Sequence, residues 1–204
     1  MKIGLLQMKV LPDQPEENRR TVARLVQEAA EQGCDVAVLP ETWNTGFFPR
    51  ERMGELAEED GGASRALLAE LAARYQMNLV GGSLVTRREE GRAEEASAIC
   101  VGGSKATHNQ TEENPSCKPL FYNTAYVFDR QGRQLARYDK VHGFSLAGEN
   151  QFFQPGQALC TFRLDGIPAG LILCYDLRFG ELARSLALQG ILSLIHIWPR
   201  RSPW

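Results

Sequence analysis

The chain has 204 residues, of which 43% are hydrophobic, so it can bury one sizeable core and falls within the ordinary size of a single domain. The formal net charge is only −2 and the Lys and Arg residues are scattered, which argues against a nucleic-acid or anionic-membrane partner. No uninterrupted apolar stretch approaches the roughly 18 residues of a membrane span, so we expect a small-molecule ligand and no membrane association.

The N-terminus and the cysteines indicate the compartment. The first residues, Met1 to Gln7, show a strand pattern without the apolar segment and cleavage site of a signal peptide, so we expect a cytoplasmic location. The five cysteines are an odd number without a C-x-x-C pair: Cys34, Cys100, Cys117, Cys160 and Cys174. They fit neither a disulfide framework nor a zinc site, and they predict free thiols.

Strand and helix patterns alternate from the start of the chain. Residues 3–8 predict a buried strand, and Asp13, Pro15 and Glu16 predict a helix start that resembles a capping box. The expected helix ends at Gly33, and its apolar face consists of Val22, Leu25, Val26, Ala29 and Ala30. Residues 35–40 predict a second buried strand. A strand, a helix and a strand form a βαβ unit, which indicates an α/β domain with functional groups at the strand ends.

The alternation continues along most of the chain. Further predicted elements are a helix at 64–75, a strand at 77–85 interrupted by Gly81 and Gly82, a hairpin of 124–129 and 134–138, a second hairpin of 159–164 and 169–174 around a turn at 165–168, and a helix at 179–189. Two stretches break this pattern. We interpret residues 92–119 as a surface insertion in a single domain of residues 1–194, and residues 195–204 as an off-pattern tail where the domain is cut short or altered.

Three polar residues directly follow predicted strands: Glu41, Lys140 and Cys174. A polar side chain at the end of a buried strand is held by a rigid element yet faces the cleft of an α/β protein. A cysteine attacks as the thiolate, which needs a nearby cation or base, and Lys140 and Glu41 can supply these. Each residue also has a simpler interpretation: Glu41 as a charge at a helix N-terminus or a surface carboxylate, Lys140 as a solvated lysine at a strand end, and Cys174 as a buried core thiol. It is the combination that favours a catalytic site.

Three segments, in this order, resemble the signature motifs of the nitrilase superfamily of carbon–nitrogen hydrolases: Leu39-Pro40-Glu41-Thr42-Trp43, Tyr138-Asp139-Lys140-Val141-His142 and Leu173-Cys174-Tyr175-Asp176-Leu177-Arg178-Phe179. Supporting matches are Gly81-Gly82-Ser83, Tyr122-Asn123-Thr124-Ala125, and Glu149 before the segment from Phe152 to Gly156. The resemblance covers about residues 1–91 and 120–191.

The resemblance implies an α/β fold, an αββα sandwich that forms a homodimer when complete and is incomplete here at the C-terminus. It also implies an amidase without metal or organic cofactor, in which Glu41 is the general base, Lys140 the oxyanion partner and Cys174 the nucleophile. The family's second glutamate corresponds to Glu149, which would orient Lys140 or the hydrolytic water. The backbone N–H of Tyr175 would share the oxyanion, and a thioester intermediate would release ammonia and then a carboxylic acid.

The residues after the cysteine indicate one branch of the family. The segment from Cys174 to Phe179 resembles the ω-amidase group, which implies that Arg178 binds a substrate carboxylate through its bidentate fork. The expected substrate is a short ω-amide of a dicarboxylic acid, such as 2-oxoglutaramate or 2-oxosuccinamate. A surface ion pair of Arg178 with Asp176 or Glu181 is the structural alternative.

The end of the sequence differs from the family pattern and leaves alternatives to an amidase function open. After Ile191 the family continues through a strand to a Pro-Ala-x-Trp-Pro segment that lines the pocket, and only Trp198-Pro199 matches it here. The missing continuation predicts exposed apolar sheet faces and leaves open an inactive homologue that acts as a binding or regulatory partner. A dinucleotide-binding module fits poorly, because Gly81-Gly82-Ser83 lacks the G-x-G-x-x-G spacing.

Overall fold

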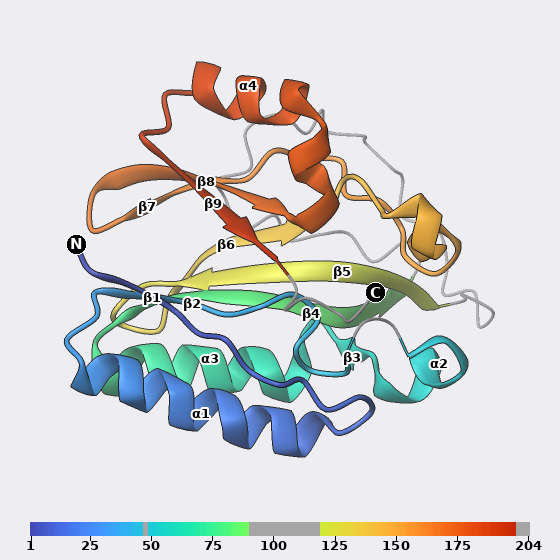
Figure 1. Ribbon diagram of the computed structural model, residues 1–204, viewed down its shortest axis with the longest axis horizontal. Coiled ribbons are helices and arrows are strands. Elements are labelled where there is room, and N and C mark those ends of the chain that lie inside the picture. Colours follow the sequence, from blue (N-terminus) through green and yellow to red (C-terminus); the bar gives the residue numbers. More distant parts are fainter. Residues whose placement is uncertain (47–48, 90–118, 199–204) are drawn as a thin grey trace, which may run out of the picture.

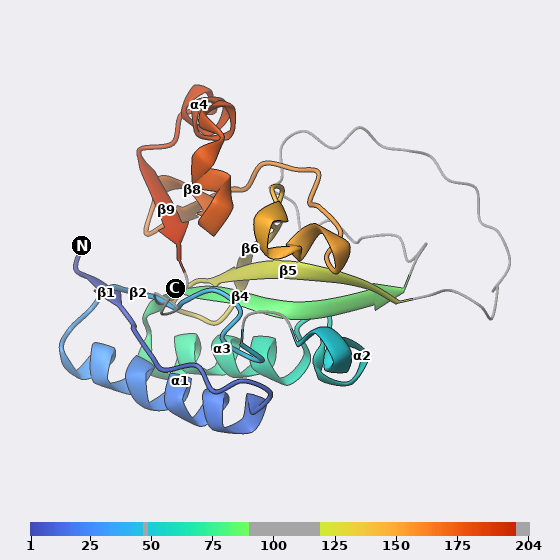
Figure 2. The ribbon, with the colours of Figure 1, turned by 45° about the vertical axis from the view of Figure 1, so that its right-hand side comes forward.

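The computed structural model describes residues 1–46, 49–89 and 119–198, which form four layers (Figure 1). Helices α1 (Pro15–Glu31) and α3 (Gly62–Tyr75) cover one face of the larger sheet. The smaller sheet packs on the other face, and helix α4 (Gly180–Leu188) lies outside it (Figure 2). This order of layers confirms the predicted αββα sandwich.

The larger sheet combines parallel and antiparallel pairing. In the described residues its strands are β1 (Ile3–Leu5), β2 (Val36–Val38), β3 (Glu58–Glu59), β4 (Asn78–Glu89), β5 (Pro119–Phe128) and β6 (Gln134–Asp139). The order is β1-β2-β4-β5-β6, with β3 beside the end of β4. Strands β1, β2 and β4 are parallel, and the β4-β5-β6 part is antiparallel. The first two strands are shorter than predicted, because they pair over only three residues each.

The smaller sheet consists of β7 (Thr161–Leu164), β8 (Ile167–Leu173) and β9 (Ser193–Ile197) within the described residues. The turn between β7 and β8 is tighter than the predicted four residues. Asp165 and Gly166 have φ angles of 47° and 83°, so the two of them alone close the hairpin, as in a type I′ turn. Strand β8 therefore begins at Ile167.

The end of the described chain corrects the prediction of a tail without regular structure from Ile195. Strand β9 runs to Ile197 and pairs in parallel with β8, from Ala169 opposite Ser193 to Leu173 opposite Ile197. So short a strand shows no clear period in sequence, and its pairing depends on a partner distant in the chain. Residues 199–204 and the predicted insertion, apart from Pro119, lie outside the described residues.

Short helical elements complete the fold. They are η1 (Arg50–Arg52), α2 (Met53–Leu56), η2 (Ser145–Ala147), η3 (Glu149–Gln151) and η4 (Cys174–Arg178). None of the helices within residues 1–46, 49–89 and 119–198 is both long and apolar enough to cross a membrane.

Helix α1 confirms the predicted apolar face but not the predicted start. Val22, Val26 and Ala29 are buried against the larger sheet. Asp13 lies in the left-handed region with φ of 58°, and the N-cap residue is Gln14, whose side chain makes no capping hydrogen bond. The expected capping box is therefore wrong, and the fixed φ of Pro15 at the first helical position sets the start instead.

A bulge in β4 shapes the loop after β2. The pairing of β4 with β5 shifts register between Val80 and Ser83, at the two glycines that interrupt the predicted strand. Gly82 has φ of +65°, and a Cβ there would lie 2.1 Å from the carbonyl oxygen of Pro40. The backbone N–H of Ser83 donates to that same oxygen over 3.1 Å. Glu41 thus stands on a loop held closely against the bulge.

Candidate active site

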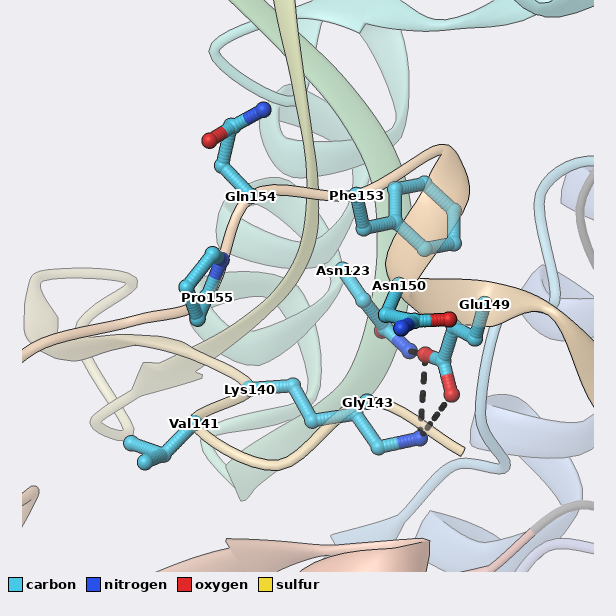
Figure 3. Close-up of a pocket in the computed structure, with 9 residues that line it drawn as sticks. All are labelled: Asn123, Lys140, Val141, Gly143, Glu149, Asn150, Phe153, Gln154 and Pro155. Carbon is cyan, nitrogen blue, oxygen red and sulfur yellow. Dashed lines mark hydrogen bonds and ion pairs between the residues drawn. The ribbon is translucent and has the colours of Figure 1, made fainter. Parts of the chain in front are cut away.

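Glu41, Lys140 and Glu149 converge in a buried cluster. The Nζ of Lys140 lies 2.8 Å from Oε1 of Glu41 and 2.8 Å from Oε2 of Glu149. The exposed fractions of the three residues are 2%, 3% and 1%. Glu41 follows β2, Lys140 directly follows β6, and Glu149 begins η3, so elements distant in sequence supply the cluster. Figure 3 shows the Lys140 side chain directed at the Glu149 carboxylate.

The two carboxylates keep Lys140 charged. Burial alone would lower the pKa of Lys140, but Glu41 and Glu149 outweigh it and hold this pKa well above its ordinary value. The ammonium is therefore a fixed positive charge inside the protein. A buried charge of this kind is effective at stabilising negative charge that develops nearby, because little water screens it.

Asn123 bridges the two glutamates. Its Nδ2 donates to Oε1 of Glu41 over 2.8 Å and to Oε1 of Glu149 over 3.1 Å. The backbone N–H of Phe144 donates to Oε2 of Glu149 over 2.7 Å. The sequence placed Asn123 only in a supporting motif and assigned it no role. Its position on β5, beside the strand that carries Lys140, is the signal that could have marked it.

One oxygen of Glu41 is left free to act as an acceptor. Oε1 accepts from Lys140 and Asn123, whereas Oε2 is buried and receives no N–H or O–H hydrogen bond within the described residues. A hydrogen bond with the Glu41 carboxylate also contributes to the raised pKa of the Cys174 thiol, so this carboxylate can accept the thiol proton.

Cys174 occupies a strained turn at the end of β8. It is the first residue of η4, is 8% exposed and has φ of +45°, a region that non-glycine residues seldom occupy. Burial raises the pKa of its thiol well above the ordinary value, and the Glu41 carboxylate raises it further, while the Lys140 ammonium lowers it. The resting group is thus a thiol that needs a base in order to attack.

Asp176 joins the segments that carry Cys174 and Lys140. Its Oδ2 accepts from the backbone N–H of Leu173 over 2.9 Å and from the hydroxyl of Tyr138 over 2.7 Å. Its Oδ1 accepts from the backbone N–H of His142 over 2.9 Å and from Nδ1 of the same residue over 2.9 Å. These contacts were not expected from the sequence.

Tyr175 and Arg178 lie on η4 outside the buried cluster. The Tyr175 ring is half-buried, with its centroid 5.0 Å from that of Phe144. Arg178 is exposed. Within the described residues no ion pair joins it to Asp176 or Glu181, and the Asp176 carboxylate is buried with its hydrogen bonds made to other residues. The structural alternative for Arg178 is therefore wrong, and its role as a carboxylate ligand stays a prediction.

A cavity of about 320 Å³ adjoins the cluster (Figure 3). Its walls are Asn123, Lys140, Val141, Gly143, Glu149, Asn150, Phe153, Gln154 and Pro155. The cavity thus reaches Lys140 and Glu149, whereas Glu41 and Cys174 are not among its walls. In the part of the chain that the structure describes, no group of three or more His, Cys, Asp or Glu side chains is arranged to hold a metal ion.

Comparisons with known proteins agree with this geometry. A family model described as carbon-nitrogen hydrolase matches residues 2–204. A 2-oxoglutaramate amidase from Bacillus subtilis is 28% identical over 199 residues, which are 97% of this chain and 65% of that protein. The omega-amidase NIT2 from Danio rerio is 32% identical over 191 residues, 88% of this chain and 57% of that protein. The chain therefore spans less than two thirds of either relative.

A solved structure shows the same fold. The NitN amidase from Neterenkonia sp. AN1 superposes with a TM-score of 0.73 at 25% identity. The match covers 96% of this chain and 66% of that one.

Proposed function

This chain belongs to the carbon–nitrogen hydrolase family, and we propose on that basis that it cleaves the C–N bond of a small amide through a thioester on Cys174. The observation that carries the proposal is the buried contact of Lys140 with Glu41 and Glu149. Cys174, at the end of β8 in the smaller sheet, lies close enough for the charges of Glu41 and Lys140 to affect the pKa of its thiol, which supports the same assignment. A nucleophile, a base and a fixed cation are the groups that acyl transfer requires.

In the first half of the reaction, Sγ of Cys174 attacks the amide carbon as Oε2 of Glu41 accepts the thiol proton. The free oxygen and the raised pKa of Cys174 support this division of roles. The carbonyl oxygen becomes an oxyanion, which the Lys140 ammonium and the backbone N–H of Tyr175 stabilise. The C–N bond then breaks, Glu41 returns its proton to the leaving nitrogen, and ammonia departs.

In the second half, Glu41 removes a proton from water as the water oxygen attacks the thioester carbon. The C–S bond breaks, the carboxylic acid leaves, and the proton returns to Cys174. Glu149 holds Lys140 in place through both halves, which its two contacts with Nζ support. No redox partner is needed, because water and the amide supply every atom of the products.

The substrate we propose is a short ω-amide of a dicarboxylic acid, such as 2-oxoglutaramate or 2-oxosuccinamate. The names of two relatives, a 2-oxoglutaramate amidase and an omega-amidase, support this choice. Arg178, exposed on η4 four residues after the nucleophile, would bind the distal carboxylate through its planar fork.

The test compares ammonia release by the protein and its Cys174→Ala variant from 2-oxoglutaramate, 2-oxosuccinamate and aliphatic amides without a carboxylate. We expect release from the first two compounds by the unmodified protein only, and an acyl adduct on Cys174 in a trapped sample analysed by mass spectrometry. Equal release by both proteins would exclude amide hydrolysis and favour a binding or regulatory role. Release from the simple amides alone would exclude the ω-amide assignment.

A further inference from the structure

Asp176 is fully buried between two segments of the candidate site. Of the four groups that donate to it, one belongs to the nucleophile turn and three belong to the segment around Lys140. Burial, together with the Asp176 carboxylate, raises the pKa of Tyr138 far above its ordinary value, so the phenol stays protonated and keeps donating. The hydrogen bond from Tyr138 to Asp176 is therefore kept across the ordinary pH range.

The donors on the lysine side flank Lys140 symmetrically. Tyr138 precedes it by two residues on β6, and His142 follows it by two residues. The His142 ring also stacks on Phe179, with centroids 3.7 Å apart and an interplanar angle of 8°. Because Asp176 and Phe179 lie on and just after η4, the lysine segment contacts both the middle and the end of the nucleophile turn.

The turn itself needs such external support. Cys174 has a positive φ, which is unfavourable for a residue other than glycine and persists only where the surrounding structure holds it. The bond from the Leu173 N–H to Asp176 closes the turn around Cys174. The same carboxylate thus fixes the backbone of the nucleophile and the strand end that carries the cation.

We propose that Asp176 is a positioning residue that sets the placement of Cys174 relative to Lys140. The proposal rests on the proposed function, because it assumes that these two residues act together. Asp176 touches no reacting atom and acts through the two segments that it joins. Loss of its contacts should let the Lys140 ammonium move away from the thiol while the fold persists.

The test measures alkylation of Cys174 by iodoacetamide at fixed pH, read by mass spectrometry of the peptide that contains this residue. The variants are Asp176→Asn, whose amide group would face donors in either orientation, and Tyr138→Phe, which removes one contact and keeps the charge. The matched control is Tyr126→Phe, because Tyr126 is equally buried and its hydroxyl donates to Asp60 over 3.1 Å, away from the site. Iodoacetamide reports thiolate content, so no amide hydrolysis is needed.

We expect alkylation to slow by about threefold in Tyr138→Phe and about tenfold in Asp176→Asn, with little change in Tyr126→Phe. A purely structural role predicts the opposite direction, because loosening exposes the thiol and speeds alkylation. Faster or unchanged alkylation in the folded Tyr138→Phe protein would overturn the proposal, even if Asp176→Asn fails to fold. A protein that hydrolyses no amide yet shows the expected order would refute the proposed function alone.

Discussion

Asn123 donates a hydrogen bond from Nδ2 to Oε1 of Glu41 over 2.8 Å, although 82 positions separate the two residues in the chain. The same nitrogen reaches Glu149, so a neutral amide separates two buried carboxylates. This bridge, together with Lys140, leaves Oε2 as the free oxygen of Glu41.

Replacement of Asn123 by Leu should remove both bonds while keeping the number and branching of the side-chain heavy atoms. We expect a loss of about 1–3 kcal/mol in the free energy of unfolding, because buried carboxylate oxygens lose a donor. We also expect kcat for the ω-amide to fall about 10- to 100-fold, because Glu41 is no longer held in one orientation. Urea unfolding and steady-state ammonia release measure the two effects.

Asn78→Leu is the matched control for this variant. Asn78 is buried, and its Nδ2 donates to Oδ2 of Asp165 over 3.0 Å and to the backbone oxygen of Asp35 over 3.3 Å, away from the site. It should lose similar stability while keeping kcat per folded molecule. An equal fall of kcat in both variants would show that Asn123 has no special role.

Lys140→Met should destabilise the protein by removing the positive charge that pairs with Glu41 and Glu149. Removal of the ammonium leaves two carboxylates buried without their cation, and breaking a buried pair in this way costs about 3–5 kcal/mol of unfolding free energy. Arg24→Met removes an exposed partner of Glu28 and should change stability by less than about 1 kcal/mol. Urea unfolding of both variants at pH 7 gives the comparison. Equal free energies of unfolding would show that the Lys140 ammonium does not stabilise the two buried carboxylates.

Gly82→Ala should distort the loop that carries Glu41. The new Cβ would lie 2.1 Å from the carbonyl oxygen of Pro40, so clash and positive φ together should cost about 2–4 kcal/mol and lower activity strongly. Gly166→Ala has a similar φ of +83° with open space around the new Cβ. It should therefore cost only about 1–2 kcal/mol and leave kcat unchanged. Equal activity in the two alanine variants would show that the bulge does not place Glu41.

The sequence predicted the strand ends better than the contacts between them. Glu41, Lys140 and Cys174 could be found because each directly follows a predicted strand, in a segment that resembles a family motif. This local signal needs no knowledge of the partner strands. The bonds of Asn123 and Asp176 could not be predicted, because they join residues that only the packing of two sheets brings together. Strand β9 was missed for the same reason, since its pairing with β8 outweighs a weak local pattern.

Arg130 should make stability depend on acidic pH. Its guanidinium contacts Asp165 over 2.6 Å and Asp35 over 3.0 Å. The pKa of Asp165 is lowered chiefly by Arg130, and that of Asp35 by the backbone N–H of Lys2 and then by Arg130. Both folded-state values lie below the ordinary 3.8, so this stability is present above that pH and is lost as the pH falls through the lowered values.

Unfolding by urea at pH 7, 5 and 3 measures this dependence. We expect little change between pH 7 and 5 from these groups, and a decline below about pH 4 that is smaller in Arg130→Met. Arg24→Met, which alters an exposed pair, should decline as steeply as the unmodified protein. Parallel curves for all three proteins would mean that Arg130 does not set the two carboxyl pKa values.

The position of the site between two sheets has a consequence for refolding. Glu41 and Lys140 leave strands of the larger sheet and Cys174 leaves the smaller one, so each sheet can complete its own hydrogen bonds before the three residues meet. Far-UV circular dichroism should therefore recover first in a refolding time course, and hydrolytic competence should return later, with the docking of the sheets. Contacts between residues so far apart in the sequence also form slowly. We therefore expect the recovery of hydrolytic activity to follow the last step of folding.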